Sequence, residues 1–120
     1  MAKKILFVDD ESDLRFMFAT FFEMSGYEVV SAGNAEEAAR LADGVPLGAI
    51  ILDVSLPGAG SAKVLESVKR SHPGAHVILY TGRQEDDTLV RNMMALGAQS
   101  YVFKDGSLKG LLDAVKEICG

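Results

Sequence analysis

Short apolar runs alternate with longer amphipathic segments along the whole chain. Five of the runs are rich in Ile, Leu, Val, Phe and Tyr, and turn-forming or charged residues flank them. A continuous apolar run of this length is typical of a strand buried on both faces of a parallel sheet. We therefore predict five strands, over residues 5–8, 27–32, 48–53, 76–81 and 100–104.

The segments between the predicted strands repeat apolar residues at helical spacing. The first such stripe consists of Leu14, Met17, Phe18, Phe21 and Phe22. We predict that Ser12 caps this helix and that Gly26 ends it. Asn34, with Glu37 three residues later, resembles a capping box and predicts a second, alanine-rich helix to about Asp43. Three more helices are predicted around residues 64–71, 89–96 and 108–118.

The regular alternation of strands and helices determines the predicted topology. It favours a parallel sheet with right-handed crossovers and helices on both faces. Five units are too few for an eight-stranded barrel, whereas the doubly wound, flavodoxin-like sheet order 2-1-3-4-5 fits. We predict an α/β fold, a three-layer (βα)5 sandwich, and one domain over residues 1–120, because no linker-like stretch interrupts the pattern.

Composition and charge exclude several classes of function. No apolar run approaches the roughly 20 residues of a membrane span, and the run after the basic N-terminus is too short for a signal peptide. We therefore expect a cytoplasmic protein without membrane contact. The net charge is −5 and no basic cluster is present, which argues against direct nucleic-acid binding. The single cysteine, Cys119, excludes an internal disulfide.

Acidic side chains follow two of the predicted strands. Asp9 and Asp10 come directly after the first strand, and Asp53 ends the third. The predicted order places these strands side by side, so the carboxylates share the edge where ligands bind in open α/β sheets. Two carboxylates about 4 Å apart repel by about 4 kcal/mol at an effective dielectric near 20. Either one carboxyl is protonated or a hard cation lies among them, and such oxygen ligands suit Mg²⁺.

Two more strands end in groups that suit phosphate chemistry. Thr81 ends the fourth strand, and its hydroxyl can donate to a phosphoryl oxygen. Lys104 ends the fifth, and its ammonium is a compact positive charge. An aspartate carboxylate is a known nucleophile in phosphoryl transfer, and a cation beside it neutralises charge on the phosphoryl group. Asp53 is therefore the candidate phosphoryl acceptor.

Five motifs occur along the chain in a specific order. They are Asp9-Asp10 after Ile5-Leu6-Phe7-Val8, Asp53 with Pro57-Gly58 after Ile50-Ile51-Leu52, Thr81-Gly82 after Val77-Ile78-Leu79-Tyr80, Gly97-Ala98, and Tyr101 ahead of Lys104. Each motif is weak alone, but together, in this order and spacing, they are highly specific. With them, the whole chain resembles the receiver domain of two-component response regulators.

The resemblance implies a phosphorelay function for the acidic site. A histidine kinase or phosphotransfer protein would transfer a phosphoryl group to Asp53, giving a 4-aspartylphosphate. Mg²⁺ would be bound by the carboxylates of Asp9, Asp10 and Asp53 and by the backbone carbonyl of Ser55. The domain would be regulatory rather than an enzyme, although it takes part in its own phosphorylation and slow dephosphorylation.

The resemblance also implies a conformational switch. Thr81 corresponds to the switch hydroxyl, Tyr101 to the aromatic switch and Lys104 to the phosphate-contacting lysine. The surface that would change consists of the fourth helix, the fifth strand and the fifth helix. A downstream protein, an output domain or a second copy in a homodimer would bind there. The cognate kinase and the downstream target are not specified by the sequence.

Two positions depart from the usual pattern of the family. The family usually has Lys-Pro with a cis bond after the fifth strand, whereas this chain has Lys104-Asp105. A cis bond before a non-proline residue costs about 3 kcal/mol or more, so we expect a trans bond and a shifted Lys104 loop. The turn after the third strand usually reads Asp or Ser and then Gly, whereas here it reads Gly60-Ser61. We expect this reversal to alter the start of the third helix more than the chemistry.

Two further positions are expected to set how long an acyl phosphate survives. Ser55 lies two residues after Asp53, and Arg83 lies two residues after Thr81. By the resemblance, both positions flank the water that hydrolyses the acyl phosphate. The sequence does not determine whether these side chains lengthen or shorten its lifetime.

Three other functions compete with the receiver hypothesis. A haloacid-dehalogenase-like phosphatase needs Asp-x-Asp after its first strand, whereas the sequence here is Asp53-Val54-Ser55. A flavodoxin-like FMN carrier needs a phosphate loop where Asp9-Asp10-Glu11 would repel phosphate. A receiver-like interaction domain not controlled by phosphorylation is kept open by Lys104-Asp105. The chain ends within a residue or two of its last predicted helix, so both a stand-alone regulator and a part of a longer regulator or hybrid kinase fit.

Overall fold

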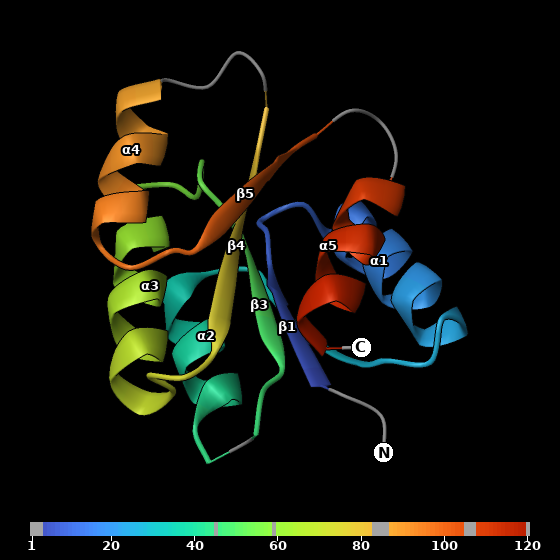
Figure 1. The fold of residues 1–120 in the computed structure, drawn as a ribbon. Helices are drawn as coiled ribbons and strands as arrows, with labels where there is room; N and C mark the ends of the chain where they lie inside the picture. The colour runs from blue at the N-terminus through green and yellow to red at the C-terminus, as the bar shows by residue number, and fades with distance from the viewer. Residues whose placement is uncertain (1–3, 45, 59, 83–86, 105–107, 120) are drawn as a thin grey trace.

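A computed structural model describes residues 4–44, 46–58, 60–82, 87–104 and 108–119, and strands alternate with helices throughout them (Figure 1). The strands are β1 (Lys4–Val8), β2 (Glu28–Ala32), β3 (Ala49–Asp53), β4 (His76–Thr81) and β5 (Ser100–Phe103). The helices are α1 (Ser12–Met24), α2 (Ala35–Ala42), α3 (Gly60–Ser71), α4 (Asp87–Ala95) and α5 (Lys109–Cys119). All the predicted elements are present, with ends that differ by a few residues.

The strands form one parallel sheet in the order β2-β1-β3-β4-β5, which confirms the predicted topology. Helices α1 and α5 cover one face of the sheet, and α2, α3 and α4 cover the other (Figure 1). In the register between β1 and β3, Val8 lies opposite Leu52. Because both strands run in the same direction, the residues that follow this pair meet at one edge of the sheet.

Each face of the sheet has its own hydrophobic core. Residues 5–8 of β1 and all of β3 are buried, as the continuous apolar runs predicted. Alternate side chains enter opposite cores, so Leu6 packs toward α2 and α3, whereas Phe7 packs toward α1. Phe7 stacks on Phe18 with ring centroids 3.9 Å apart, and Phe18 stacks on Phe22 at 4.0 Å. Full burial of each such side chain contributes about 1.5–3 kcal/mol.

The first two helices begin differently. The α2 prediction is confirmed, since the Asn34 side chain accepts the Glu37 N–H at 2.8 Å and the Glu37 carboxylate accepts the Gly33 N–H at 2.8 Å. The α1 prediction was wrong by one residue: Ser12 is the first helical residue, and Glu11 occupies the cap position without a side-chain capping bond. A carboxylate at this position is favourable because the helix dipole places positive charge there.

The apolar stripe of α1 is only partly buried. Phe18 and Phe22 are fully buried, whereas Met17, a member of the same apolar stripe, is 57% exposed. Phe16 and Met24 are also exposed, and with Met17 they line an open groove of about 690 Å³ between α1 and the start of α5. None of the described helices is long and apolar enough to cross a membrane.

Candidate functional site

The acidic residues gather where β1 and β3 end. Asp9 follows β1 and Asp53 ends β3, and both are buried, whereas Asp10 is exposed. One carboxylate oxygen from each of Asp9, Asp10 and Asp53 lies within 4.8 Å of the other two. The structure therefore brings together the three carboxylates that the sheet order had placed at one edge.

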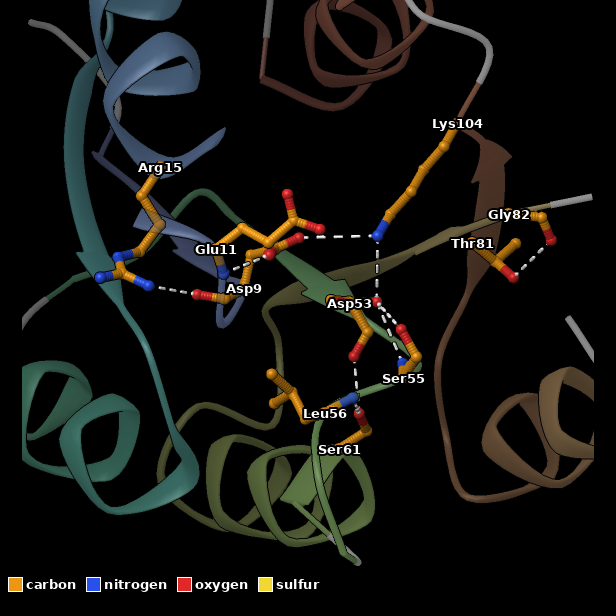
Figure 2. Close-up of polar contacts among 10 residues, drawn as sticks. All are labelled: Asp9, Glu11, Arg15, Asp53, Ser55, Leu56, Ser61, Thr81, Gly82 and Lys104. Atoms are coloured by element: carbon orange, nitrogen blue, oxygen red, sulfur yellow. Dashed lines mark hydrogen bonds and ion pairs between the residues drawn. The ribbon is translucent and has the colours of Figure 1, made fainter. Parts of the chain in front are cut away.

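The Asp53 carboxylate is anchored through one of its oxygens. Its Oδ1 accepts hydrogen bonds from the Ser55 N–H at 3.0 Å, the Ser55 hydroxyl at 2.8 Å and the Lys104 ammonium at 3.3 Å (Figure 2). Three donors on one oxygen hold the carboxylate in a single orientation. The second oxygen takes no part in these three contacts.

Asp9 has one satisfied oxygen and one unsatisfied oxygen. Its Oδ1 accepts the Glu11 N–H at 2.9 Å. Its buried Oδ2 has no hydrogen-bond partner among the described residues, although the Lys104 ammonium lies 3.6 Å away. Burial raises the pKa of Asp9 from 3.8 to about 6, and the negative charge of Asp53 adds to this, while the Glu11 N–H and Lys104 oppose it. A buried, under-satisfied carboxylate oxygen beside other carboxylates suits a hard divalent cation.

Lys104 reaches between the two buried carboxylates. Its ammonium lies 3.3 Å from Asp53 Oδ1 and 3.6 Å from Asp9 Oδ2, as Figure 2 shows. Burial lowers the pKa of Lys104, but the charges of Asp53 and Asp9 and the hydrogen bond to Asp53 outweigh burial, and the pKa is raised. The backbone N–H of Lys104 donates to the Thr81 carbonyl at 2.7 Å, which ties it to the end of β4. The predicted trans bond to Asp105 lies outside the described residues.

The two predicted switch residues lie apart from the carboxylates. Thr81 is fully buried, and its hydroxyl donates to the Gly82 carbonyl at 3.2 Å (Figure 2). Tyr101 is 49% exposed, with its ring edge-on against Phe103 at 5.5 Å between centroids. A cavity of about 340 Å³ lies beside this ring, between α4 and β5. Arg83, the other residue expected to affect the acyl phosphate, lies outside the described residues.

Ser61 is a site residue whose role the sequence analysis missed. It lies in the first turn of α3, is 4% exposed, and its hydroxyl donates to the backbone carbonyl of Asp53 at 2.6 Å. The reversed order Gly60-Ser61 therefore contacts the candidate acceptor itself, and does more than alter the start of the helix. The departure from the usual turn sequence was the only signal for it, because helical periodicity does not reveal hydroxyl–carbonyl contacts.

Comparison with known proteins agrees with this geometry. A family model described as the response regulator receiver domain matches residues 5–116. The chain belongs to this family. The receiver domain is 33% identical, over 121 residues, to the phosphate regulon transcriptional regulatory protein PhoB of Pseudomonas aeruginosa; the match covers 98% of this chain and 52% of PhoB. The chain thus spans about half the length of PhoB.

Solved structures support the same assignment. A CheY-like receiver domain protein from Methanospirillum hungatei matches with a TM-score of 0.89 and 27% identity, covering 98% of this chain and 93% of that chain. The response regulator TrrA of Thermotoga maritima, solved in complex with Mg²⁺-BeF, matches with a TM-score of 0.82 and 28% identity, covering 97% and 98%. The family match selects a receiver domain, a regulatory domain of two-component systems, over the phosphatase and flavin-carrier alternatives.

Proposed function

We propose that this receiver domain accepts a phosphoryl group on Asp53 from a histidine kinase or phosphotransfer protein. The observation that best supports this is the convergence of an anchored Asp53 carboxylate, the Lys104 ammonium and a buried Asp9 oxygen without a hydrogen-bond partner among the described residues. In such a pocket Asp53 is the nucleophile and Lys104 supplies a positive charge. The Asp9 oxygen is a ligand that a cation can bind.

The residues present fit Mg²⁺ as the cation. The carboxylates of Asp9, Asp10 and Asp53 offer only oxygen ligands, and the carbonyl of Ser55 is proposed as a fourth. When bound, the ion neutralises charge on the phosphoryl oxygens. The relative TrrA was solved in complex with Mg²⁺-BeF, which supports this choice.

The transfer step uses the side chains already described. A carboxylate oxygen of Asp53 attacks phosphorus, the bond from phosphorus to the donor's imidazole nitrogen breaks, and its electron pair returns to that nitrogen. The Ser55 N–H and hydroxyl hold Oδ1 of Asp53 during the attack. The Lys104 ammonium, now 3.3 Å from Asp53 Oδ1, is within reach of the incoming phosphoryl oxygens.

The same modification is proposed to operate the switch. The Thr81 hydroxyl would leave the Gly82 carbonyl and donate to a phosphoryl oxygen instead. Tyr101 would then move from its half-exposed position into the cavity between α4 and β5, which would alter the α4–β5–α5 surface. This surface is proposed to control a downstream protein or output domain, or to form a homodimer.

The decisive experiment is an intact-mass measurement after incubation with acetyl phosphate and MgCl₂. We expect a single, labile phosphoryl adduct on the wild type and none on Asp53→Asn, because the amide is not a nucleophile for phosphorus. Asp113→Asn, which changes an exposed aspartate on α5, is the matched control and should be phosphorylated like the wild type. An adduct that persists on Asp53→Asn would refute the assignment. Complete absence of the adduct would favour an interaction domain not controlled by phosphorylation, for which the Lys104 ion pairs supply an internal cation.

A further inference from the structure

The loop between β3 and α3 is tied together by one buried hydroxyl. Ser61 donates to the Asp53 carbonyl at 2.6 Å and accepts the Leu56 N–H at 3.3 Å. A serine hydroxyl offers one donor and two acceptor positions, so both contacts are made at once. The end of β3, the middle of the loop and the first turn of α3 therefore meet at a single oxygen atom (Figure 2).

The loop held in this way carries the donors that orient the acceptor carboxylate. Ser55 lies between the two backbone groups that Ser61 contacts, and its N–H and hydroxyl both donate to Asp53 Oδ1. If the Ser61 contacts are lost, the Leu56 N–H and the Asp53 carbonyl lose partners in a buried environment, and the loop can relax. Ser55 would then no longer be held at one distance from Asp53.

The neighbouring glycine explains why the hydroxyl is at position 61. A Cβ at Gly60 would lie 3.1 Å from the Leu56 Cβ, closer than ordinary contacts allow. A side chain at position 60 would therefore push Leu56 away from the helix start, whereas position 61 directs its hydroxyl at the strand end. The reversed order Gly60-Ser61 thus combines close packing of the loop with a contact to Asp53.

We propose that Ser61 is a positioning residue that sets the affinity of the acidic site for divalent cations by holding the Ser55 loop against Asp53. Ser61 touches Asp53 only through its backbone carbonyl, so it acts through the loop and not on the phosphoryl group. This inference rests on the proposed function, because it concerns the cation site that the function requires. Residues that orient metal ligands from outside the ligand set commonly change metal affinity by roughly 10–100-fold.

The test is a titration of the full chain with MgCl₂, followed by two-dimensional NMR, on the wild type and three variants. Ser61→Ala removes both contacts and should weaken Mg²⁺ binding by roughly tenfold. Ser61→Thr keeps the hydroxyl and should restore most of the affinity. Ser71→Ala removes a hydroxyl–carbonyl bond of 3.0 Å at the other end of the same helix and should bind like the wild type.

Hydrogen exchange without Mg²⁺ supplies a second readout. In Ser61→Ala the amides of Ser55 and Leu56 should exchange faster than in the wild type, whereas amides in the centre of β3 should keep their protection. A merely structural role would lower protection throughout α3 and leave the Mg²⁺ affinity of the folded protein unchanged. That result, or equal Mg²⁺ affinities for Ser61→Ala and Ser71→Ala, would overturn the inference. A wild type that binds no Mg²⁺ would instead overturn the proposed function itself.

Discussion

The two halves of the site differ in how completely their polar groups are arranged. On the β1–β3 side, Asp53 accepts three donors on one oxygen and one on its backbone carbonyl. On the β4–β5 side, the Thr81 hydroxyl donates to the adjacent Gly82 carbonyl, and Tyr101 lies half exposed beside a cavity. The first half is preorganised for binding, whereas we expect Thr81 and Tyr101 in the second half to be able to rearrange.

The difference shows that binding of a reactive group and conformational switching place different demands on neighbouring residues. A nucleophile and its cation ligands work best when they are held rigidly, because no reorganisation is then needed at the moment of reaction. A switch needs two arrangements of similar free energy, which a local change in charge can shift. We expect the residues at the ends of the buried strands β1 and β3 to stay fixed and the residues near β5 to rearrange, and this division would meet both requirements.

The largest expected effect comes from Asp9→Asn in the preorganised half. The pKa of Asp9 is raised from 3.8 to about 6, so the folded state holds the proton more tightly than the unfolded chain. The free energy of unfolding should therefore fall as the pH rises from about 4 to above 6, by about 3 kcal/mol for a shift of roughly two units. In Asp9→Asn, urea titrations without Mg²⁺ should no longer show this fall in the free energy of unfolding with pH. The variant should also bind Mg²⁺ at least about tenfold more weakly.

If the free energy of unfolding of Asp9→Asn still falls as the pH rises, another group is responsible for the pH dependence. Mg²⁺ itself provides the complementary check, because a cation bound by the charged form of Asp9 lowers its pKa. With saturating MgCl₂ the wild type should lose the stability decrease above pH 4. An unchanged profile would show that Asp9 does not contact the ion.

Lys104→Met should have the next largest effect. The change removes the ammonium from between Asp53 and Asp9, and loss of a charge-assisted hydrogen bond costs roughly 1–3 kcal/mol of the free energy of unfolding at pH 7. Mg²⁺ should offset part of this loss, and it should bind Lys104→Met more tightly than it binds the wild type. Phosphorylation of the variant by acetyl phosphate should be slower. Lys109→Met, in an exposed pair with Asp113, should change stability by less than about 1 kcal/mol. This expectation assumes that the Lys104 ammonium and Mg²⁺ compete for the carboxylates of Asp53 and Asp9. Weaker Mg²⁺ binding in Lys104→Met would contradict it.

Thr81→Ala tests the other half of the comparison. Mg²⁺ affinity should match the wild type, since the Thr81 hydroxyl contacts Gly82 and not the carboxylates. The loss of a buried hydroxyl should cost about 1 kcal/mol of the free energy of unfolding. After addition of beryllofluoride, which mimics the phosphoryl group, the NMR shifts of α4 and β5 should no longer change. Thr81→Ser keeps the hydroxyl and should restore these changes, and a full response in Thr81→Ala would remove Thr81 from the switch.

Tyr101→Ala should change the resting protein little. Because the ring is half exposed, the free energy of unfolding should change by less than about 1.5 kcal/mol, which covers the loss of its contact with Phe103. Mg²⁺ affinity and phosphorylation should be unchanged. The amides of Val90 and Met94, which line the adjacent cavity, should respond less to beryllofluoride than in the wild type. An undiminished response there would show that the ring does not transmit the change.

Much of the preorganised half could be predicted, and much of the switch half could not. The apolar runs predicted the strands, and the doubly wound order predicted that Asp9 lies beside Asp53, which the structure confirms. The direction of the Thr81 hydroxyl had no counterpart in the pattern of residues, because a rotamer depends on its neighbours. The exposure of Met17 could not be predicted for a related reason, since periodicity does not say how much of a helix face the sheet covers.

The sequence by itself determined which residues stand at the carboxyl edge of the sheet, because strand identity and order follow from hydrophobic periodicity and the handedness of crossovers. The tertiary structure alone decided that the Ser61 hydroxyl donates to the Asp53 carbonyl and that the Lys104 ammonium lies between both buried carboxylates. It also decided that Asp9 has an oxygen without a hydrogen-bond partner in the described part of the chain. The physical reason is the distance along the chain over which each property acts. Periodicity is a property of neighbouring residues, whereas hydrogen bonds are sensitive to changes of a few tenths of an ångström in the distance between groups brought together from different strands and loops.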